Sequence, residues 1–214
     1  MKKTMTALLA ALMVLSFASC NNSNSTSSGS SSASSQVSSQ VSSQEPASSE
    51  ENKTESTIKD SLALLESVWN SFEEDKKFPV AGGDMTQENM KDGAPGIFNI
   101  ADASELDRVL GFPQADIDKI DGAASIFHMM NLNTFTCGAF HVKDVANIDA
   151  LTAALKDNIM KRQWMCGFPD KLVVAVVDDY IVSFFGKEDP VNNFRDQLTA
   201  VYSAAKVAVE SPIE

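Results

Sequence analysis

LVVAVVDDYIVSFF, residues 172–185, is the stretch that decides the fold. Two runs of apolar and β-forming residues, 172–177 and 180–185, stand on either side of the pair Asp178-Asp179. Runs of this length that flank turn-forming residues are typical of two β-strands joined by a tight turn. The stretch therefore predicts a β-hairpin.

A second hairpin is predicted before this one. Residues 123–130 and 134–142 are also rich in apolar and β-forming residues, and the sequence NLN at 131–133 supplies turn chemistry between them. A helix is expected after each hairpin. The first covers about 147–162, and the second begins near Pro190, since a first helical turn accepts proline.

Helical patterns also precede the hairpins. Apolar residues recur at spacings of three and four over 58–74, which predicts an amphipathic helix with this buried face: Ile58, Leu62, Leu65, Trp69 and Phe72. Residues 78–99 contain several Gly and Pro and predict a long loop, which in a compact domain is often functional. Asp102 resembles the cap of a short helix that ends near Leu110, before Gly111.

Together these elements predict an α+β fold for residues 58–214, which we expect to form a single globular domain. Its centre is a four-stranded antiparallel sheet made of two β-hairpins, each followed by a helix, with the N-terminal helix added. The two later helices are expected on one face of the sheet. The other face is either covered by the first helix and the long loop or left as a binding surface.

The N-terminus has the layout of a bacterial lipoprotein signal. A basic start precedes the apolar run 5–17, which is shorter than the roughly 20 residues needed to span a membrane. FASC at 17–20 resembles a lipobox, although a Phe replaces the commoner first Leu. We predict a signal peptide at 1–19 and fatty acylation of Cys20, for example by palmitate. The alternative is an ordinary secreted protein cut near Ala18, with a free cysteine.

Residues 20–57 are predicted to form the lipidated cysteine and a disordered, Ser-rich tether. The segment after the cysteine lacks aromatic residues and nearly all large aliphatic ones, so ordering it would cost entropy with nothing buried in return. The sequence SSQV occurs at 34–37 and again at 38–41, as in low-complexity linkers. We expect the domain to be held at the extracytoplasmic face of the cell membrane through this anchor.

The charge of the chain restricts its partners. The net charge is −12, and it becomes −14 when Lys2 and Lys3 leave with the signal peptide. An acidic domain repels phosphate backbones and anionic lipid surfaces. We therefore expect no nucleic acid partner and no face-on contact with the membrane.

Cysteine and histidine side chains are the first candidates for chemistry. Cys137 and His141 share a face of one predicted strand and His128 lies on its partner, so a Cys–His–His metal site is conceivable but lacks a fourth ligand. Histidines packed within the sheet fit the pattern better, and we predict neither metal nor cofactor. Cys137 and Cys166 could form a disulfide in this compartment, or they could be two buried thiols.

The stretch 163–169, QWMCGFP, is the most unusual local sequence. It joins a predicted helix to a strand, and it could form the wall of an apolar pocket through these side chains: Trp164, Met165, Cys166 and Phe168. Such a pocket would lie beside the glycine-rich segment 81–83. The alternative is a connection whose aromatic residues close the end of the core.

Three motifs resemble a family of uncharacterised lipid-anchored surface proteins of Gram-positive anaerobes. They are SIFHMM at 125–130, TFTCGAF at 134–140 and WMCGFP at 164–169. The resemblance implies a location on the outer face of the cytoplasmic membrane. It supplies no catalytic residue.

The sequence thus favours a non-catalytic binding or accessory module at the cell envelope. Its partner would be an envelope protein, a peptide or a glycan, and no catalytic motif is recognised. The alternative function is a small extracytoplasmic enzyme or redox protein that uses Cys137, Cys166 or His141.

Overall fold

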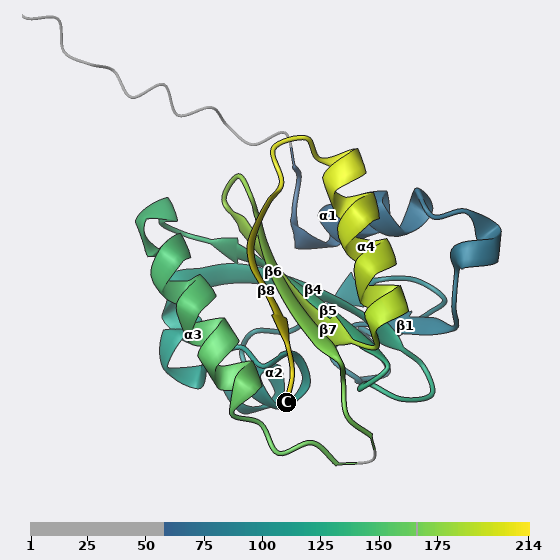
Figure 1. Cartoon of the computed structure of the whole chain (residues 1–214). Helices are drawn as coiled ribbons and strands as arrows, with labels where there is room; N and C mark the ends of the chain where they lie inside the picture. Colours follow the sequence, from purple (N-terminus) through teal and green to yellow (C-terminus); the bar gives the residue numbers. More distant parts are fainter. Residues whose placement is uncertain (1–57, 166) are drawn as a thin grey trace, which may run out of the picture. The chain divides into compact units, whose positions relative to one another are not determined.

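The computed structural model describes residues 58–165 and 167–214. They form one antiparallel sheet of eight strands with helices on both faces (Figure 1). The predicted α+β class and antiparallel sheet are confirmed, whereas the prediction of four strands is wrong. The signal peptide, Cys20 and the tether lie outside the described residues.

The centre of the sheet is made of the two predicted hairpins. Strands β4 (Ile120–His128) and β5 (Phe135–Val142) form the first, and β6 (Lys171–Val177) and β7 (Tyr180–Gly186) form the second. They are joined through β5 and β7, so the central order is β4-β5-β7-β6. Asp178, in the turn of the second hairpin, has a left-handed φ of 52°, as tight hairpin turns require.

Four further strands were missed from the sequence. Strand β8 (Lys206–Pro212) pairs with β6 at one edge, where most of its side chains stay exposed and no apolar pattern marks it. The predicted long loop contains β1 (Val80–Gly82), β2 (Lys91–Asp92) and β3 (Gly96–Ile97), of which β1 and β3 pair with β4. Strands of two or three residues are too short to show a period of two.

Four α-helices cover the sheet: α1 (Ser61–Asn70), α2 (Ala103–Leu110), α3 (Ile148–Met160) and α4 (Glu188–Val201). Short 3-10 helices lie at Glu74–Lys76, Gln114–Lys119 and Val145–Asn147. The cap predicted at Asp102 is confirmed, because its carboxylate accepts the N–H of Glu105 at 3.0 Å. Asp60 caps α1 in the same way, accepting the N–H of Ala63 at 2.8 Å.

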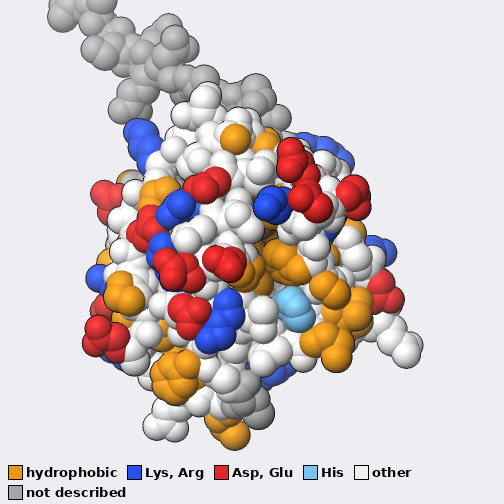
Figure 2. Space-filling model, turned by 45° about the vertical axis from the view of Figure 1, so that its right-hand side comes forward, with side chains coloured by type: hydrophobic (Ala, Val, Ile, Leu, Met, Phe, Trp, Pro, Cys, Tyr) orange, Lys and Arg blue, Asp and Glu red, His pale blue; other side chains and the backbone are white. Residues whose placement is uncertain are grey.

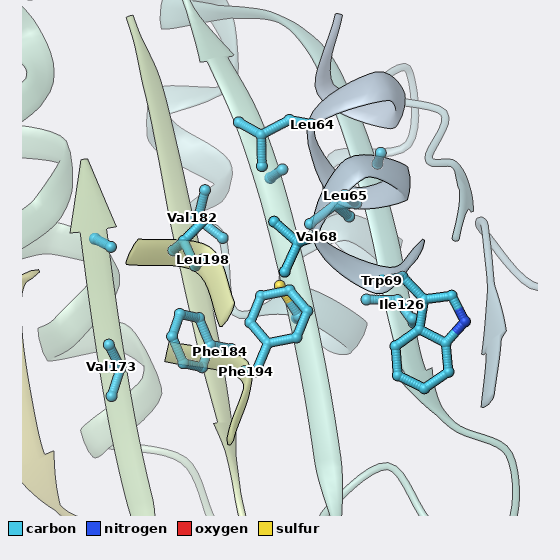
Figure 3. Packing of buried hydrophobic residues seen from close by; sticks show 14 of the residues in the cluster. Leu64, Leu65, Val68, Trp69, Ile126, Val173, Val182, Phe184, Phe194 and Leu198 are labelled. Atoms are coloured by element: carbon cyan, nitrogen blue, oxygen red, sulfur yellow. The ribbon is translucent and has the colours of Figure 1, made fainter. Parts of the chain in front are cut away.

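The domain has a hydrophobic core on each face of the sheet. Helices α1 and α4 pack on one face around Val68 and Phe194, whose neighbours from the strands include Phe184 (Figure 3). Helices α2 and α3 pack on the other face around Leu110 and Leu155. The prediction that the helices after the two hairpins share one face is therefore wrong (Figure 1).

The strand order explains why α3 and α4 lie on opposite faces. Helix α3 connects β5 to β6 across β7, and α4 connects β7 to β8 across β6, so both connections step in the same direction along the sheet. Strands β5 and β7 run antiparallel. Two crossovers of the same hand that start from antiparallel strands and step the same way must use opposite faces, and right-handed crossovers are strongly preferred.

Candidate functional site

An open cavity of about 380 Å³ lies where the start of α1 meets the start of β4. It is lined by the first turn of α1, by residues 121–123, which we call its floor, and by residues 97–100 together with Asn89. The polar lining side chains are two carboxylates, two carboxamides and one hydroxyl: Asp60, Asp121, Asn89, Asn99 and Ser61. The lining residues include no lysine, arginine or histidine.

Ser61 is the most unusual residue of this site. It is only 4% exposed, and its hydroxyl has no hydrogen-bond partner among the described residues. The hydroxyl lies over Gly122, because a Cβ built on that glycine would be 3.7 Å from Ser61 Oγ and would meet nothing closer. A buried hydroxyl without a partner is costly, and a ligand that completes its hydrogen bonds removes this cost.

The floor of the cavity is tied to the rest of the sheet by His141. Its Nδ1 contacts a carboxylate oxygen of Asp121, and its Nε2 lies 3.1 Å from Asp179 Oδ2. A β-bulge between Ile120 and Gly122 places Asp121 at this point. Burial alone would lower the pKa of His141, but the hydrogen bonds and charges of both carboxylates outweigh it and raise the pKa.

This arrangement does not form a nucleophilic triad. A serine triad needs one imidazole nitrogen directed at the serine hydroxyl and the other at a carboxylate. Both ring nitrogens of His141 face carboxylates, so neither is left to take a proton from Ser61. His141 therefore links β4, β5 and the β6–β7 turn through its two carboxylate contacts.

The potential near the cavity is negative. Burial and then the charges of Asp179, Asp60 and Asp121 raise the pKa of the neighbouring Tyr180 to about 12. The carboxylates that disfavour a phenolate here would favour a cation. On the face of the domain in Figure 2, by contrast, acidic and basic side chains are interspersed.

Another carboxylate, Asp84, does not line the cavity but supports one of its walls. It is 6% exposed and accepts hydrogen bonds from Thr86, from the side chain of Asn89 at 2.7 Å, and from the N–H of Asn99 at 3.3 Å. Burial would raise its pKa, yet these hydrogen bonds together lower it. Asp84 thus holds the carboxamide of Asn89 and the backbone of Asn99 in place.

The residues proposed from sequence lie elsewhere. Trp164 packs against Phe185 at a centroid distance of 5.1 Å, whereas Met165 and Phe168 are 79% and 54% exposed. Cys166 lies outside the described residues, so the pocket predicted from this stretch stays a prediction. None of these residues lines the cavity beside α1.

The cysteine and histidine candidates are also separated. Cys137 is fully buried between the sheet and helices α1 and α4, and burial raises the pKa of its thiol well above the ordinary value. Its disulfide with Cys166 remains a prediction. His128 stacks on Phe78, and its Nδ1 accepts the N–H of Met130 at 3.2 Å. Within 58–165 and 167–214, no three His, Cys, Asp or Glu side chains are grouped to hold a metal ion.

Only part of the cavity lining could be recognised from sequence. Asp60 is recognisable as a helix cap, but no sequence pattern pairs it with Asp121, which is brought near only by packing of α1 on β4.

None of the described helices is long and apolar enough to cross a bilayer. Comparisons with protein-family models, curated proteins and solved structures found no match to this chain.

Proposed function

We propose that the chain is a membrane-tethered extracytoplasmic lipoprotein that acts as a non-catalytic binding module. The cavity beside α1 is its ligand site. The observation that carries this proposal is the buried Ser61 hydroxyl: it has no hydrogen-bond partner within 58–165 and 167–214, and Ser61 lines an open cavity together with two carboxylates. A site with this unused hydrogen-bonding capacity gains free energy when a ligand fills it.

The proposed location depends on the N-terminal sequence. The basic start, the short apolar run and the FASC motif favour acylation of Cys20, and the polar segment to residue 57 favours a tether. The resemblance to lipid-anchored surface proteins of Gram-positive anaerobes points the same way. The acid-rich composition favours a domain that stands off the lipid surface.

Binding rather than catalysis is favoured by the chemistry of the candidate groups. Cys137 has no access to solvent and a raised thiol pKa, which are unfavourable for a nucleophile or redox group. Both nitrogens of His141 are engaged by carboxylates, which is unfavourable for a general base.

Two measurements on the full-length chain test the proposal. Mass spectrometry after expression in a bacterium should find a fatty acyl adduct on Cys20 and none in a Cys20→Ala variant. A chain without acyl groups that fractionates with the cytosol would contradict the anchor.

The binding role is tested by NMR spectra of the full-length chain, recorded while peptides, glycans and small metabolites are added. We expect at least one class to shift the amide signals of Ser61, Gly122 and Asn99 without being consumed. Turnover of an added compound, or a survey that never perturbs these signals, would contradict a binding role for this cavity.

A further inference from the structure

We infer that the cavity binds an alkylammonium group, that is, a protonated amine at the end of a short aliphatic chain. This inference rests on the proposed function, since it names the ligand of the same site. The group could belong to a free amine or to a lysine side chain of a peptide. Three observations on the cavity lead to this chemistry.

The first observation is the sign of the charge. Asp60 and Asp121 both line the cavity, and each side chain is about half exposed, at 49% and 51%. Asp121 shares its charge with His141, but His141 also faces Asp179, so the group of three carboxylates keeps an excess of negative charge. The ammonium of Lys59 lies 3.7 Å from Asp60, but its side chain is 86% exposed and therefore well hydrated.

The second observation is the unpartnered hydroxyl of Ser61. A hydroxyl oxygen accepts hydrogen bonds, and an ammonium group has three N–H bonds to donate. A Cβ added at Gly122, which also lines the cavity, would lie 3.7 Å from this hydroxyl in ordinary van der Waals contact, so the hydroxyl is close to the cavity floor. An ammonium group bound in the cavity would pair with the two carboxylates, and a small opening of the first turn of α1 would let it donate to the buried hydroxyl.

The third observation is the apolar part of the lining. Leu62, Ile97 and Ile100 line the walls, and Ile97 is 53% exposed. These aliphatic side chains suit the methylene groups of an alkylamine. The one aromatic lining residue, Phe98, is only 1% exposed, so it offers no ring face on which a sugar could stack.

The test uses NMR titration of the full-length chain with three probes: butylamine, its neutral isostere butan-1-ol, and Nα-acetyl-lysine N-methylamide. We expect the two amines to shift the signals of Ser61 and Gly122 and butan-1-ol to bind at least tenfold more weakly. Tighter binding of the lysine derivative identifies a peptide side chain as the source, and tighter binding of butylamine identifies a free amine. Equal binding of butylamine and butan-1-ol would overturn the inference.

A matched pair of variants tests the role of charge. Asp60→Asn removes a carboxylate from the cavity while asparagine still caps α1. Asp144→Asn makes the same change at another cap, which accepts the N–H of Ala146 at 3.0 Å and lies outside the cavity. We expect about threefold weaker butylamine binding in Asp60→Asn only, as for one half-exposed ion pair. The same affinity in both variants would contradict the inference.

The outcomes separate this inference from the proposed function. If the amines leave the cavity signals unchanged while a neutral or anionic compound shifts them, the inference is wrong and the cavity is still a binding site. If no compound of any class shifts them, the proposed function is wrong as well.

Discussion

Ser125 and Ser61 are both buried beside strand β4, yet their surroundings are opposite. Ser125 lies within β4, is 0% exposed, and its hydroxyl both donates to the carbonyl of Gly83 at 2.8 Å and accepts the Gly83 N–H at 2.9 Å. Ser61 is 4% exposed, and its hydroxyl has no partner in the described part of the chain. An unpaired buried polar group costs about 1–3 kcal/mol. One part of β4 is thus fully hydrogen-bonded to its neighbour, and the other lies beside a hydroxyl that is left unpaired among the described residues.

The glycines beside the two serines show the same contrast. A Cβ on Gly82, at the Ser125 end, would stand 2.3 Å from the backbone nitrogen of Gly96. A Cβ on Gly122, at the Ser61 end, would meet nothing closer than 3.7 Å. The backbones are in direct contact at Gly82, whereas an added Cβ would fit in ordinary van der Waals contact at Gly122.

We expect the largest effect from adding a methyl group at Gly82, where the backbones are in direct contact. Gly82→Ala should lower the free energy of unfolding by about 3 kcal/mol or more, because the colliding atoms belong to the backbone and cannot rotate away. Urea denaturation measures the loss. Gly122→Ala is the matched control and should change stability by less than about 1 kcal/mol, towards greater stability. Equal losses in both variants would remove the contrast between the two ends.

The next effect concerns the hydrogen bonds of Ser125. Ser125→Ala leaves the N–H and the carbonyl of Gly83 without this partner and should cost about 2–3 kcal/mol in urea denaturation. Ser67→Ala serves as the control, because its hydroxyl only donates to the Ala63 carbonyl at an exposed position, and it should change stability by less than about 0.5 kcal/mol.

Ser61→Ala should change the free energy of unfolding in the opposite direction to Ser125→Ala. Removing an unpaired hydroxyl from the first turn of a helix should raise the free energy of unfolding by about 1 kcal/mol. The same change should weaken binding of butylamine in the NMR titration. A variant that is less stable than the parent would show that the hydroxyl has a structural role.

Much of the fold could be predicted from local sequence. Apolar runs around Asp178-Asp179 and 131–133 located both hairpins, and Asp102 with Gly111 bounded α2 correctly. Strand β8 could not be found in this way, because an exposed edge strand needs no apolar face. The faces taken by α3 and α4 depend on strand order, which local periodicity does not contain.

The candidate site was less predictable. Asp60 and Gly122 are far apart in the chain and have separate local roles, one as a cap and one in a strand. Ser61 is buried without a hydrogen-bond partner in the described part of the chain because of how α1 packs, and no sequence pattern predicts this. Trp164 was a candidate because aromatic residues often line binding pockets, but it packs against Phe185.

The smallest effect is a gradual pH dependence at the open end of β4. His141 has a raised pKa in the folded state, so its contribution to stability is fully present below the ordinary value of 6.5. It is lost as the pH rises through the higher, folded pKa. Thermal unfolding should therefore show stability falling with rising pH in this window, and His141→Gln should flatten the slope. An imidazole NMR titration with a midpoint below 6.5 would contradict this.

The position of β7 between β5 and β6 also bears on how the chain reaches its native state. A ribosome or export channel delivers β6 first, yet the strand that docks on β5 is β7. The edge of β5 therefore stays unpaired until residues 180–186 have emerged and the second hairpin can add to the sheet as a unit. During that interval the half-made sheet exposes an unpaired strand, which is the stage most open to aggregation and most in need of a chaperone.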